Sequence, residues 1–339
     1  MQAISRLKEL LRTPKKIVIT THQKPDADAL GSSLALWGYL KKYGHQVQVI
    51  TPTDYPDFLA WMNGNDHVIQ YDQSQKSMEI SNKIIAEAEV IFCLDFSDLK
   101  RIEPMDKPIR YAKATKVLLD HHQGNTKFAD IEFWDVKASA TAELVYDLII
   151  DMGDKHLLDI PIAEAIYAGV LTDTGSFKFP STSPKVHMVI ADLMTIGIKA
   201  AQVHRNIYDN NSVDRLKFLG FALQEKLIVK PEYKTAYFAI TSQELRSFNH
   251  KTGDTEGIVN YALSLKDICF AAIMMEKPDC IRISFRSFGN FSVNEFANKH
   301  FNGGGHRNAA GGKSMLSLAE TVAQFERLLP IYQNILLEA

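Results

Sequence analysis

The sequence predicts an α/β protein with a mostly parallel sheet covered by helices on both faces, followed by a smaller α+β C-terminal domain across a cleft. Three observations support this prediction. Short apolar runs alternate with amphipathic segments in the first half, a long helical region follows, and strands and helices are then mixed. The runs expected to form buried strands are Ile17–Thr21, Val47–Ile50, Val90–Leu94 and Lys116–Leu119.

The segments between these runs have the spacing of helices. One apolar helix face consists of Leu30, Leu34, Trp37 and Leu40. We expect this helix to end near Gly44, and further helices over Ser74–Glu89 and Glu143–Met152. Strands and helices in alternation favour a parallel sheet.

The length of 339 residues favours two domains. A helical region from Pro184 to Leu227 is interrupted at Asp209–Ser212, and the composition changes there. Three later segments, KTAYFAI, DICFAAIMM and IRISFRS, read as strands, and Glu256–Leu265 and Ser292–His300 read as helices. We therefore expect a metal-binding catalytic domain over residues 1–195, a helical linker over 196–228 and a substrate-binding domain over 229–339.

Composition and charge restrict the class of function. No apolar run approaches the roughly 18 residues that a membrane helix needs, and the N-terminus lacks the apolar segment of a signal peptide, so we expect a soluble, cytoplasmic protein. The three cysteines are an odd number in separate apolar contexts, which favours buried thiols. A net charge of −2 and a pI near 6.6 argue against binding to long nucleic acid.

Polar residues follow three of the four apolar runs. TTHQKPDAD follows the first run, DFSD the third and DHH the fourth. Ligands of such sheets bind beyond the carboxyl ends of the strands, so these residues are the candidates for chemistry.

His22, Asp26 and Asp28 are expected to converge on a loop, because Pro25 disfavours helix in the residue before it. The alternative reading makes Asp28 a helix cap and His22 a surface residue.

The helix after this loop is expected to begin near Ala29. Gly31 and the backbone amides near Ser32 and Ser33 would then lie close to its positive end. Phosphate binds readily at such a position.

Charged residues also end the later apolar segments. Asp95 ends one expected strand, and Asp120, His121 and His122 end another, where charge is unfavourable unless something positive is bound. Asp173 follows the apolar segment before LTDTG, with a glycine two residues later that can turn the chain. Each residue alone could cap a helix or turn, but together they indicate a site at one sheet edge.

These motifs, THQKPDADALGS, LDFSD, LDHH and LTDTG, resemble in kind and order those of the DHH phosphoesterase superfamily. The second half is similar to the DHH-associated C-terminal domain through ISFRS and NGGGHRNAAGG. The resemblance spans almost the whole chain.

The resemblance implies two metal ions. Their ligands would be His22, Asp26 and Asp95 for one ion, and Asp28, Asp95, His121 and Asp173 for the other. Asp95 would bridge the ions, His122 would face the substrate and Asp120 would orient a neighbouring imidazole. Two divalent ions can share a water and lower its pKa, so that hydroxide attacks phosphorus. The ligands suit Mn²⁺, which the resemblance favours, and also Fe²⁺, Co²⁺ or Mg²⁺.

The resemblance also implies a substrate-binding group in the second domain. Its members are Arg286, Ser287, Gly303, Gly304, Gly305 and His306. An arginine can bind phosphate through two hydrogen bonds, and glycines let the backbone approach a ligand.

Within the superfamily, the two-domain form resembles the nano-RNase and pAp phosphatase group, which cuts short oligoribonucleotides to nucleoside monophosphates and pAp to AMP. Alternatives are a cyclic or linear dinucleotide phosphodiesterase, an exopolyphosphatase-like hydrolase and a catalytically silent nucleotide sensor. The expected partners are a short oligonucleotide or small phosphorylated nucleotide and a second copy of the chain as a homodimer, with no long duplex and no membrane. The preferred substrate, the direction of attack, the native metal and the oligomeric state stay open.

Overall fold

The computed structural model describes residues 2–338, which form two compact units divided between Asn210 and Asn211. The division lies inside the segment 196–228 that the sequence assigns to a linker. Val203 of that segment belongs to the core of the first unit, whereas Phe218 and Ala222 belong to a core of the second. A separate linker over 196–228 stays a prediction.

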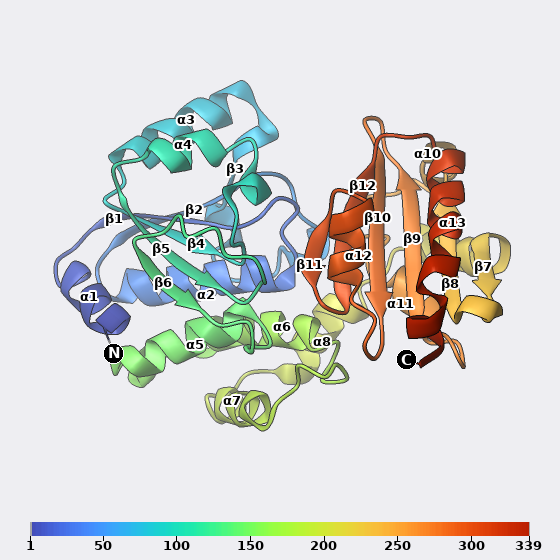
Figure 1. The fold of residues 1–339 in the computed structure, drawn as a ribbon. Coiled ribbons are helices and arrows are strands. Elements are labelled where there is room, and N and C mark those ends of the chain that lie inside the picture. Colours follow the sequence, from blue (N-terminus) through green and yellow to red (C-terminus); the bar gives the residue numbers. More distant parts are fainter. Residues whose placement is uncertain (1, 339) are drawn as a thin grey trace. The chain divides into compact units, whose positions relative to one another are not determined.

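The first unit is built on a six-stranded, fully parallel sheet in the order β3-β2-β1-β4-β5-β6 (Figure 1). Its strands are β1 (Lys16–Thr20), β2 (Gln46–Thr51), β3 (Ile69–Gln70), β4 (Val90–Leu94), β5 (Thr115–Asp120) and β6 (Ile131–Trp134). The four apolar runs correspond to β1, β2, β4 and β5, which confirms the parallel sheet predicted from them.

Helices cover both faces of this sheet. They are α1 (Gln2–Leu10), α2 (Ala27–Lys42), α3 (Gln75–Glu87), α4 (Asp106–Tyr111), α5 (Thr141–Met152), α6 (Ile160–Asp173), α7 (Pro184–Thr195) and α8 (Ala200–Tyr208). Side chains of β4 alternate between the two layers: Phe92 packs in the core that includes α2, α5 and α6, and Cys93 packs in the core that includes α3 and α4. The predicted α/β architecture is therefore confirmed.

Glycines bring α2 and α6 into close contact. A Cβ on Gly31 would lie 2.5 Å from the carbonyl oxygen of Ala165, so only glycine fits this crossing. The hydroxyls of Ser32 and Ser33 donate to the carbonyl of Ala29, and both residues are fully buried. The expectation of a phosphate site around Gly31 is wrong, because these residues lie in the packed body of the helix rather than at an open end.

The second unit contains a mixed six-stranded sheet in the order β11-β12-β10-β9-β8-β7. The strands are β7 (Leu227–Lys230), β8 (Thr235–Ile240), β9 (Phe270–Glu276), β10 (Ile281–Ser287), β11 (Gly304–His306) and β12 (Ala309–Ser314). Among the strands described within residues 211–338, only β8 and β9 pair in parallel. The helical segments are α9 (Val213–Phe221), a π-helix (Ala222–Lys226), α10 (Ser242–Ser247), α11 (Ile258–Leu263), α12 (Val293–His300) and α13 (Leu318–Glu338). This α+β unit agrees with the prediction.

Membrane spans and thiols can both be assessed for residues 2–338. No single helix there is long and apolar enough to cross a membrane, although α7 and α8, bent by 113°, pass by length and composition when taken as a pair. Cys93 and Cys269 are buried free thiols, and Cys280 is a partly exposed one.

Candidate metal centre

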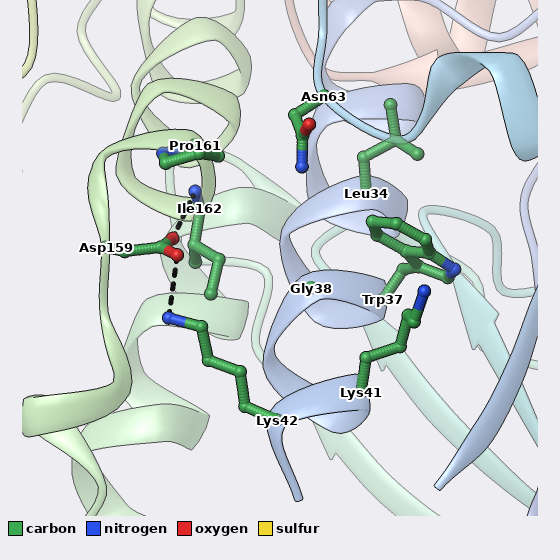
Figure 2. Close-up of a pocket in the computed structure, with 9 residues that line it drawn as sticks. All are labelled: Leu34, Trp37, Gly38, Lys41, Lys42, Asn63, Asp159, Pro161 and Ile162. Atoms are coloured by element: carbon green, nitrogen blue, oxygen red, sulfur yellow. Dashed lines mark hydrogen bonds and ion pairs between the residues drawn. The ribbon is translucent and has the colours of Figure 1, made fainter. Parts of the chain in front are cut away.

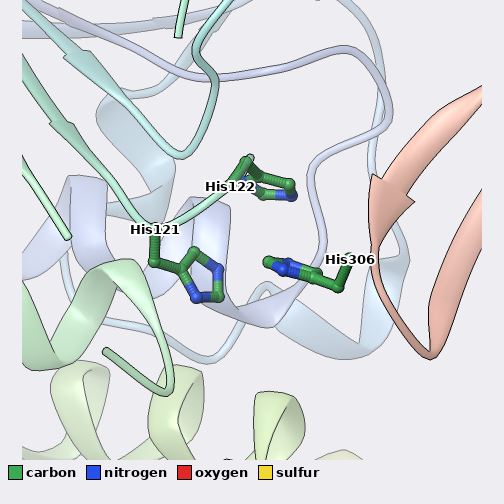
Figure 3. A group of neighbouring side chains, drawn as sticks. All are labelled: His121, His122 and His306. Carbon is green, nitrogen blue, oxygen red and sulfur yellow. The ribbon is translucent and has the colours of Figure 1, made fainter. Parts of the chain in front are cut away.

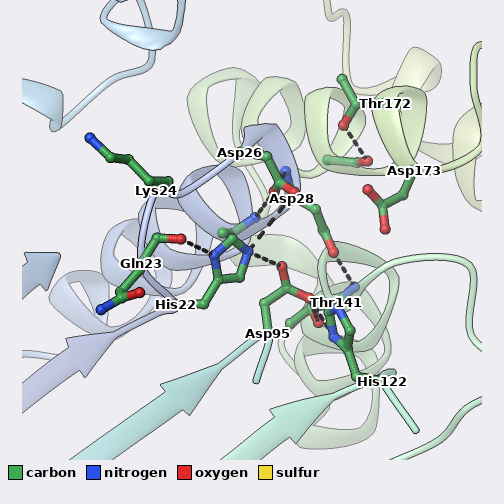
Figure 4. A network of polar contacts seen from close by, with 12 residues as sticks. His22, Gln23, Lys24, Asp26, Asp28, Asp95, His122, Thr141, Thr172 and Asp173 are labelled. Atoms are coloured by element: carbon green, nitrogen blue, oxygen red, sulfur yellow. Dashed lines mark hydrogen bonds and ion pairs between the residues drawn. The ribbon is translucent and has the colours of Figure 1, made fainter. Parts of the chain in front are cut away.

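The charged residues singled out in the sequence of the first unit meet at the carboxyl edge of the parallel sheet (Figure 4). His22 follows β1, Asp95 follows β4, and His121 and His122 follow β5. Asp173 is the last residue of α6. Segments far apart in the sequence thus bring their side chains to one place.

The loop between β1 and α2 differs in one respect from the expectation. The helix begins at Ala27, so Asp28 lies in its first turn rather than on the loop. Asp26 is the N-cap, and its Oδ1 accepts hydrogen bonds from the backbone N–H groups of Asp28 and Ala29 at 3.1 and 3.0 Å. The other Asp26 oxygen, Oδ2, faces His22.

A first group consists of His22, Asp26 and Asp95. Nε2 of His22 lies 3.3 Å from Oδ2 of Asp95 and 3.9 Å from Oδ2 of Asp26. Nδ1 of the same ring is 2.7 Å from the carbonyl oxygen of Gln23. If Nδ1 carries the proton and donates to this carbonyl, Nε2 is left as a lone-pair donor directed at the carboxylates.

A second group consists of Asp28, His121 and Asp173. Nε2 of His121 lies 3.6 Å from Asp28 Oδ2, 3.2 Å from Asp173 Oδ2 and 3.4 Å from Asp95 Oδ1. Nδ1 of His121 is 3.2 Å from the carbonyl oxygen of Ala138. Asp95 therefore lies between the groups, with Oδ2 toward His22 and Oδ1 toward His121.

His122 occupies the same edge in another orientation. The rings of His121 and His122 meet edge to face, with centroids 4.9 Å apart (Figure 3). Nδ1 of His122 lies 2.9 Å from Oδ1 of the buried Asp120 and 3.5 Å from Oδ1 of Asp95. Asp120 is thus placed to orient the His122 ring, the arrangement that the sequence resemblance implies for a neighbouring imidazole.

The ionisable side chains of the two groups are buried close to one another, and this shifts their pKa values. Burial, followed by the charges of Asp95 and Asp173, raises the pKa of Asp28 well above its usual range. Burial would also raise the pKa of Asp95, but hydrogen bonds with His121 and His22 hold this pKa well below its usual range. Burial opposes the charged form of His121, yet its contacts with Asp173 and Asp95 raise its pKa well above 6.5.

The donor set fits divalent cations. In each group the candidate ligand atoms lie within 4.8 Å of one another. Carboxylate oxygens combined with imidazole nitrogens are ligands for transition metals such as manganese and iron. A cation would replace the protons that these buried carboxylates and imidazoles otherwise share.

The backbone at this edge is strained. Asp95 has a φ of 66°, a conformation that few residues other than glycine adopt. Gly175, Ser176 and Phe177 follow α6 with φ values of 56°, 59° and 65°. The expected sharp turn at Gly175 is therefore present and continues through two residues that are not glycine, which is typical of functional sites.

Thr141 is a part of the site that the sequence reasoning missed. Its N–H donates to Asp28 Oδ2 at 2.6 Å, its hydroxyl donates to Asp95 Oδ1 at 2.8 Å, and the N–H of Ala142 donates to Asp28 Oδ1 at 2.8 Å. The N-terminus of α5 thus holds two of the candidate ligands. The sequence signal, a threonine before an apolar helix, could have predicted a helix start but not these partners.

The chain resembles known proteins over most of its length. The family model described as "DHH family, N-terminal domain" matches residues 16–170, and the DHHA1 domain model matches residues 234–331. The crystal structure of an exopolyphosphatase-related protein from Bacteroides fragilis is 38% identical, covers 99% of this chain and 97% of that chain, and has a TM-score of 0.92. The chain belongs to the DHH family.

Two curated relatives match this DHH phosphoesterase over most of the length of both chains. Both are named bifunctional oligoribonuclease and PAP phosphatase NrnA and are 28% identical to this chain. The match to the Bacillus subtilis protein covers 89% of this chain and 91% of the relative. The match to the Thermus thermophilus protein covers 87% and 83%. The chain is accordingly a metal-dependent hydrolase of phosphate esters, as the sequence resemblance predicts.

In the second unit, β10, β12 and β11 align two of the expected substrate-binding residues. Arg286 pairs with Ala309, and Ala309 pairs with His306. Paired residues of an antiparallel sheet point to the same face, so Arg286 and His306 lie on one face, two strands apart. Arg286 and His306 are both partly exposed.

Ser287 has a different environment from Arg286. It is 3% exposed, its hydroxyl donates to the carbonyl of Phe291 at 2.7 Å, and it accepts from the Asn308 amide at 2.9 Å. Ser287 thus connects β10 to the segment after it, and its expected contact with a substrate stays a prediction.

The three glycines before His306 differ from one another. A Cβ on Gly303 would lie 2.0 Å from the carbonyl oxygen of Gly311, and one on Gly305 would lie 2.6 Å from that of Ala309. Gly304 meets nothing closer than a side-chain oxygen of Asn294 at 3.5 Å. Gly303 and Gly305 are therefore needed for close approach to β12, and only Gly304 has room on its Cβ side.

A separate hollow of about 170 Å³ lies along the C-terminal half of α2 (Figure 2). Lys42 forms an ion pair with Asp159 at 2.8 Å, and the amino group of Lys41 lies 4.5 Å from the centre of the Trp37 ring. Lys41 is 13 residues from Asp28, or roughly 20 Å along the helix. This hollow is distinct from the candidate metal centre.

Proposed function

We propose that this DHH phosphoesterase hydrolyses short oligoribonucleotides to nucleoside monophosphates and removes a phosphate from pAp to give AMP, in a manganese-dependent reaction. The position of Asp95 between two groups of ligand atoms is the observation that carries the proposal. The names of the two 28% identical relatives support the substrate class.

The proposed ligands of the first ion are His22, Asp26 and Asp95, and those of the second are Asp28, Asp95, His121 and Asp173. When bound, two divalent cations activate water for attack on phosphorus. The four aspartates formally balance two divalent cations, so an arriving phosphate needs further cationic or hydrogen-bond donors. His122, held by Asp120, is proposed to face that phosphate.

In the second unit we propose that Arg286 and His306 bind the part of the nucleotide that does not react, and that Gly304 lets the backbone approach it. The common face of Arg286 and His306 supports this role. We also propose residues 1–195 as the catalytic domain, residues 229–339 as the substrate-binding domain, and residence in the cytoplasm. Homodimer formation stays a prediction that light scattering would check.

A substrate panel tests the proposed function. Purified protein supplied with Mn²⁺, and in parallel with Mg²⁺, Co²⁺ or Fe²⁺, is incubated with pAp, RNA of two to five nucleotides, long RNA, cyclic di-AMP, pyrophosphate and polyphosphate. We expect the highest kcat/KM for pAp and the shortest RNAs, because a near-neutral chain offers little attraction for a long polyanion.

Other outcomes of the panel would replace the proposal. Preference for cyclic di-AMP or polyphosphate would favour the corresponding alternative hydrolase. A kcat/KM that rises with RNA length would indicate a processive exonuclease. Binding of nucleotides without turnover of any substrate, with all four metals, would indicate a sensor.

A further inference from the structure

A second hollow in the first unit lies on α8 and α6, and we call it the α8 hollow. It has a volume of about 420 Å³. Its lining residues are Tyr167, Ala200, Ala201, His204, Arg205 and Asp209. None of them belongs to the candidate metal centre, and the volume is within the range of small-molecule sites.

The α8 hollow adjoins the metal centre through α6. Tyr167 precedes Asp173 by six residues on that helix, a separation of about 9 Å. On α8, the ring of Tyr208 lies one turn beyond His204, with the two ring centroids 4.8 Å apart.

The strained turn after Asp173 forms another connection. Ser176, with a φ of 59°, places its hydroxyl 3.0 Å from Nε2 of His204. The chain therefore passes directly from a proposed metal ligand to a contact with a residue that lines the hollow. A group bound in the hollow would be held at a defined distance from the metal centre.

The lining has the chemistry of a nucleotide site. Tyr167 is only 6% exposed, so the partly exposed His204 ring offers the surface for a base, and Ala200 and Ala201 leave space beside it. Arg205 is exposed, and no ion pair holds its guanidinium within residues 2–338, so it can bind a phosphate. His204 supplies a second polar group.

We propose that the α8 hollow binds the nucleoside monophosphate unit next to the scissile phosphate of a short oligonucleotide. The inference rests on the proposed function, and it adds a specificity site within the first unit. The distance of about 9 Å along α6 suits a nucleotide unit that is attached directly to the reacting phosphate.

Filling the hollow tests the inference. Ala201→Trp places a large side chain in it, and Ala201 is exposed, so the fold should tolerate the change. Gln202→Trp is the matched control, because Gln202 is exposed on the same helix and does not line the hollow. For a 5′-phosphorylated diribonucleotide, Ala201→Trp should raise KM by about tenfold or more, while Gln202→Trp should not.

Two further measurements separate binding from chemistry. Hydrolysis of bis-p-nitrophenyl phosphate, which has no nucleoside, should be unchanged in Gln202→Trp, and in Ala201→Trp it should fall less than hydrolysis of the diribonucleotide does. Arg205→Gln should raise the KM for the diribonucleotide by about tenfold to a hundredfold, as expected for loss of a charge-assisted hydrogen bond. An unchanged KM in both variants, or equal losses on both substrates, would overturn the inference.

Calorimetric titration with AMP keeps this test independent of the proposed function. If the wild-type protein hydrolyses no member of the substrate panel, the proposed function fails, yet AMP binding can still be measured. Binding that Ala201→Trp weakens and Gln202→Trp preserves supports the hollow as a nucleotide site. Absence of AMP binding, or binding equal in both variants, overturns it.

Discussion

The strongest sequence motifs lie at the carboxyl edge of the first sheet and in the glycine-rich hairpin that β11 and β12 form in the second unit. The physical reason for the residue types differs between these two regions. At the first edge, buried charges such as Asp28 and Asp95 are destabilising unless a cation or a set of donors offsets them. In the hairpin, Gly303 and Gly305 are required because neighbouring backbone leaves no space for a Cβ. A motif can thus record chemistry in one unit and packing in the other.

The comparison predicts that the two regions fail differently when they are altered. Changes at the first edge should remove metal and turnover while the fold survives. Changes at Gly303 should destabilise the second unit. The three tryptophans, Trp37, Trp61 and Trp134, all lie in the first unit, so their fluorescence follows that unit alone, whereas circular dichroism follows both.

The largest effect is expected at Asp95. Asp95→Asn should lower kcat/KM by more than about 10³-fold and reduce bound metal, because the shared carboxylate loses its charge. Asparagine is the suitable replacement, since it tolerates the left-handed backbone at this position better than alanine does. Elemental analysis, activity and the tryptophan unfolding transition give the result. A variant that keeps two metals and its activity would remove Asp95 from the mechanism.

A smaller loss is expected when the sheet face of the second unit that carries Arg286 and His306 is changed. Arg286→Ala or His306→Ala should each lower kcat/KM for pAp or a dinucleotide by about ten- to a hundredfold, the effect of losing a charge-assisted hydrogen bond of about 1.5–3 kcal/mol. Metal content should stay constant.

The control for these two variants is bis-p-nitrophenyl phosphate, which lacks the distal part of a nucleotide. Both variants should hydrolyse it nearly as well as the wild-type protein does. Equal losses on the nucleotide and on this ester would show that Arg286 and His306 act in the chemical step instead.

Packing in the hairpin predicts a difference between adjacent glycines. Gly303→Ala should lower the free energy of unfolding of the second unit by about 1–3 kcal/mol, because the new Cβ overlaps a backbone carbonyl. Gly304→Ala, where the space is open, should change it by less than about 1 kcal/mol. Urea unfolding followed by circular dichroism measures both variants, and tryptophan fluorescence should not move. Equal stability of the two variants would contradict the packing explanation.

The sequence predicted those features of the fold that depend on local patterns. Buried parallel strands read as apolar runs, and charges at their ends are conspicuous, so β1, β4 and β5 and the residues after them could be found. The strands β3 and β6 could not, because they are short edge strands with partly exposed side chains.

Long-range contacts explain what the sequence reasoning missed. Thr141 contacts Asp28 across 113 residues and Asp95 across 46, and nothing in its own neighbourhood indicates either partner. The same holds for Gly31, where glycine is required because the carbonyl of Ala165 on another helix leaves no space for a Cβ. From sequence alone, a glycine near a helix start suggests anion binding. Its role in close packing becomes visible only when the neighbouring helix is in place.

The smallest predicted effect concerns the stability of the first unit at acid pH. It involves His45, which precedes β2 and so lies at the end of the sheet opposite the carboxyl edge. His45 is buried, and its Nδ1 accepts a hydrogen bond from the Lys15 N–H at 3.1 Å. Burial, followed by the charge of Lys15, lowers the pKa of His45 below 6.5. A group whose pKa is lowered on folding binds its proton more weakly in the folded state. Its contribution to stability is therefore present above pH 6.5 and is lost as the pH falls through the folded pKa.

His45→Gln should reduce this acid sensitivity, because glutamine can accept the same hydrogen bond and does not titrate. The free energy of unfolding, followed by tryptophan fluorescence in urea at pH 7 and pH 5, should fall less in His45→Gln than in the wild-type protein. The metal centre titrates equally in both proteins, so its contribution cancels in the difference. The control is His156→Gln, because His156 is an exposed histidine of the same unit. The free energy of unfolding of this variant should fall between pH 7 and pH 5 by as much as that of the wild-type protein. If His45→Gln and His156→Gln lose equal stability on acidification, protonation of the buried His45 does not lower the stability of the first unit. The loss of stability at acid pH would then come from the carboxyl edge alone.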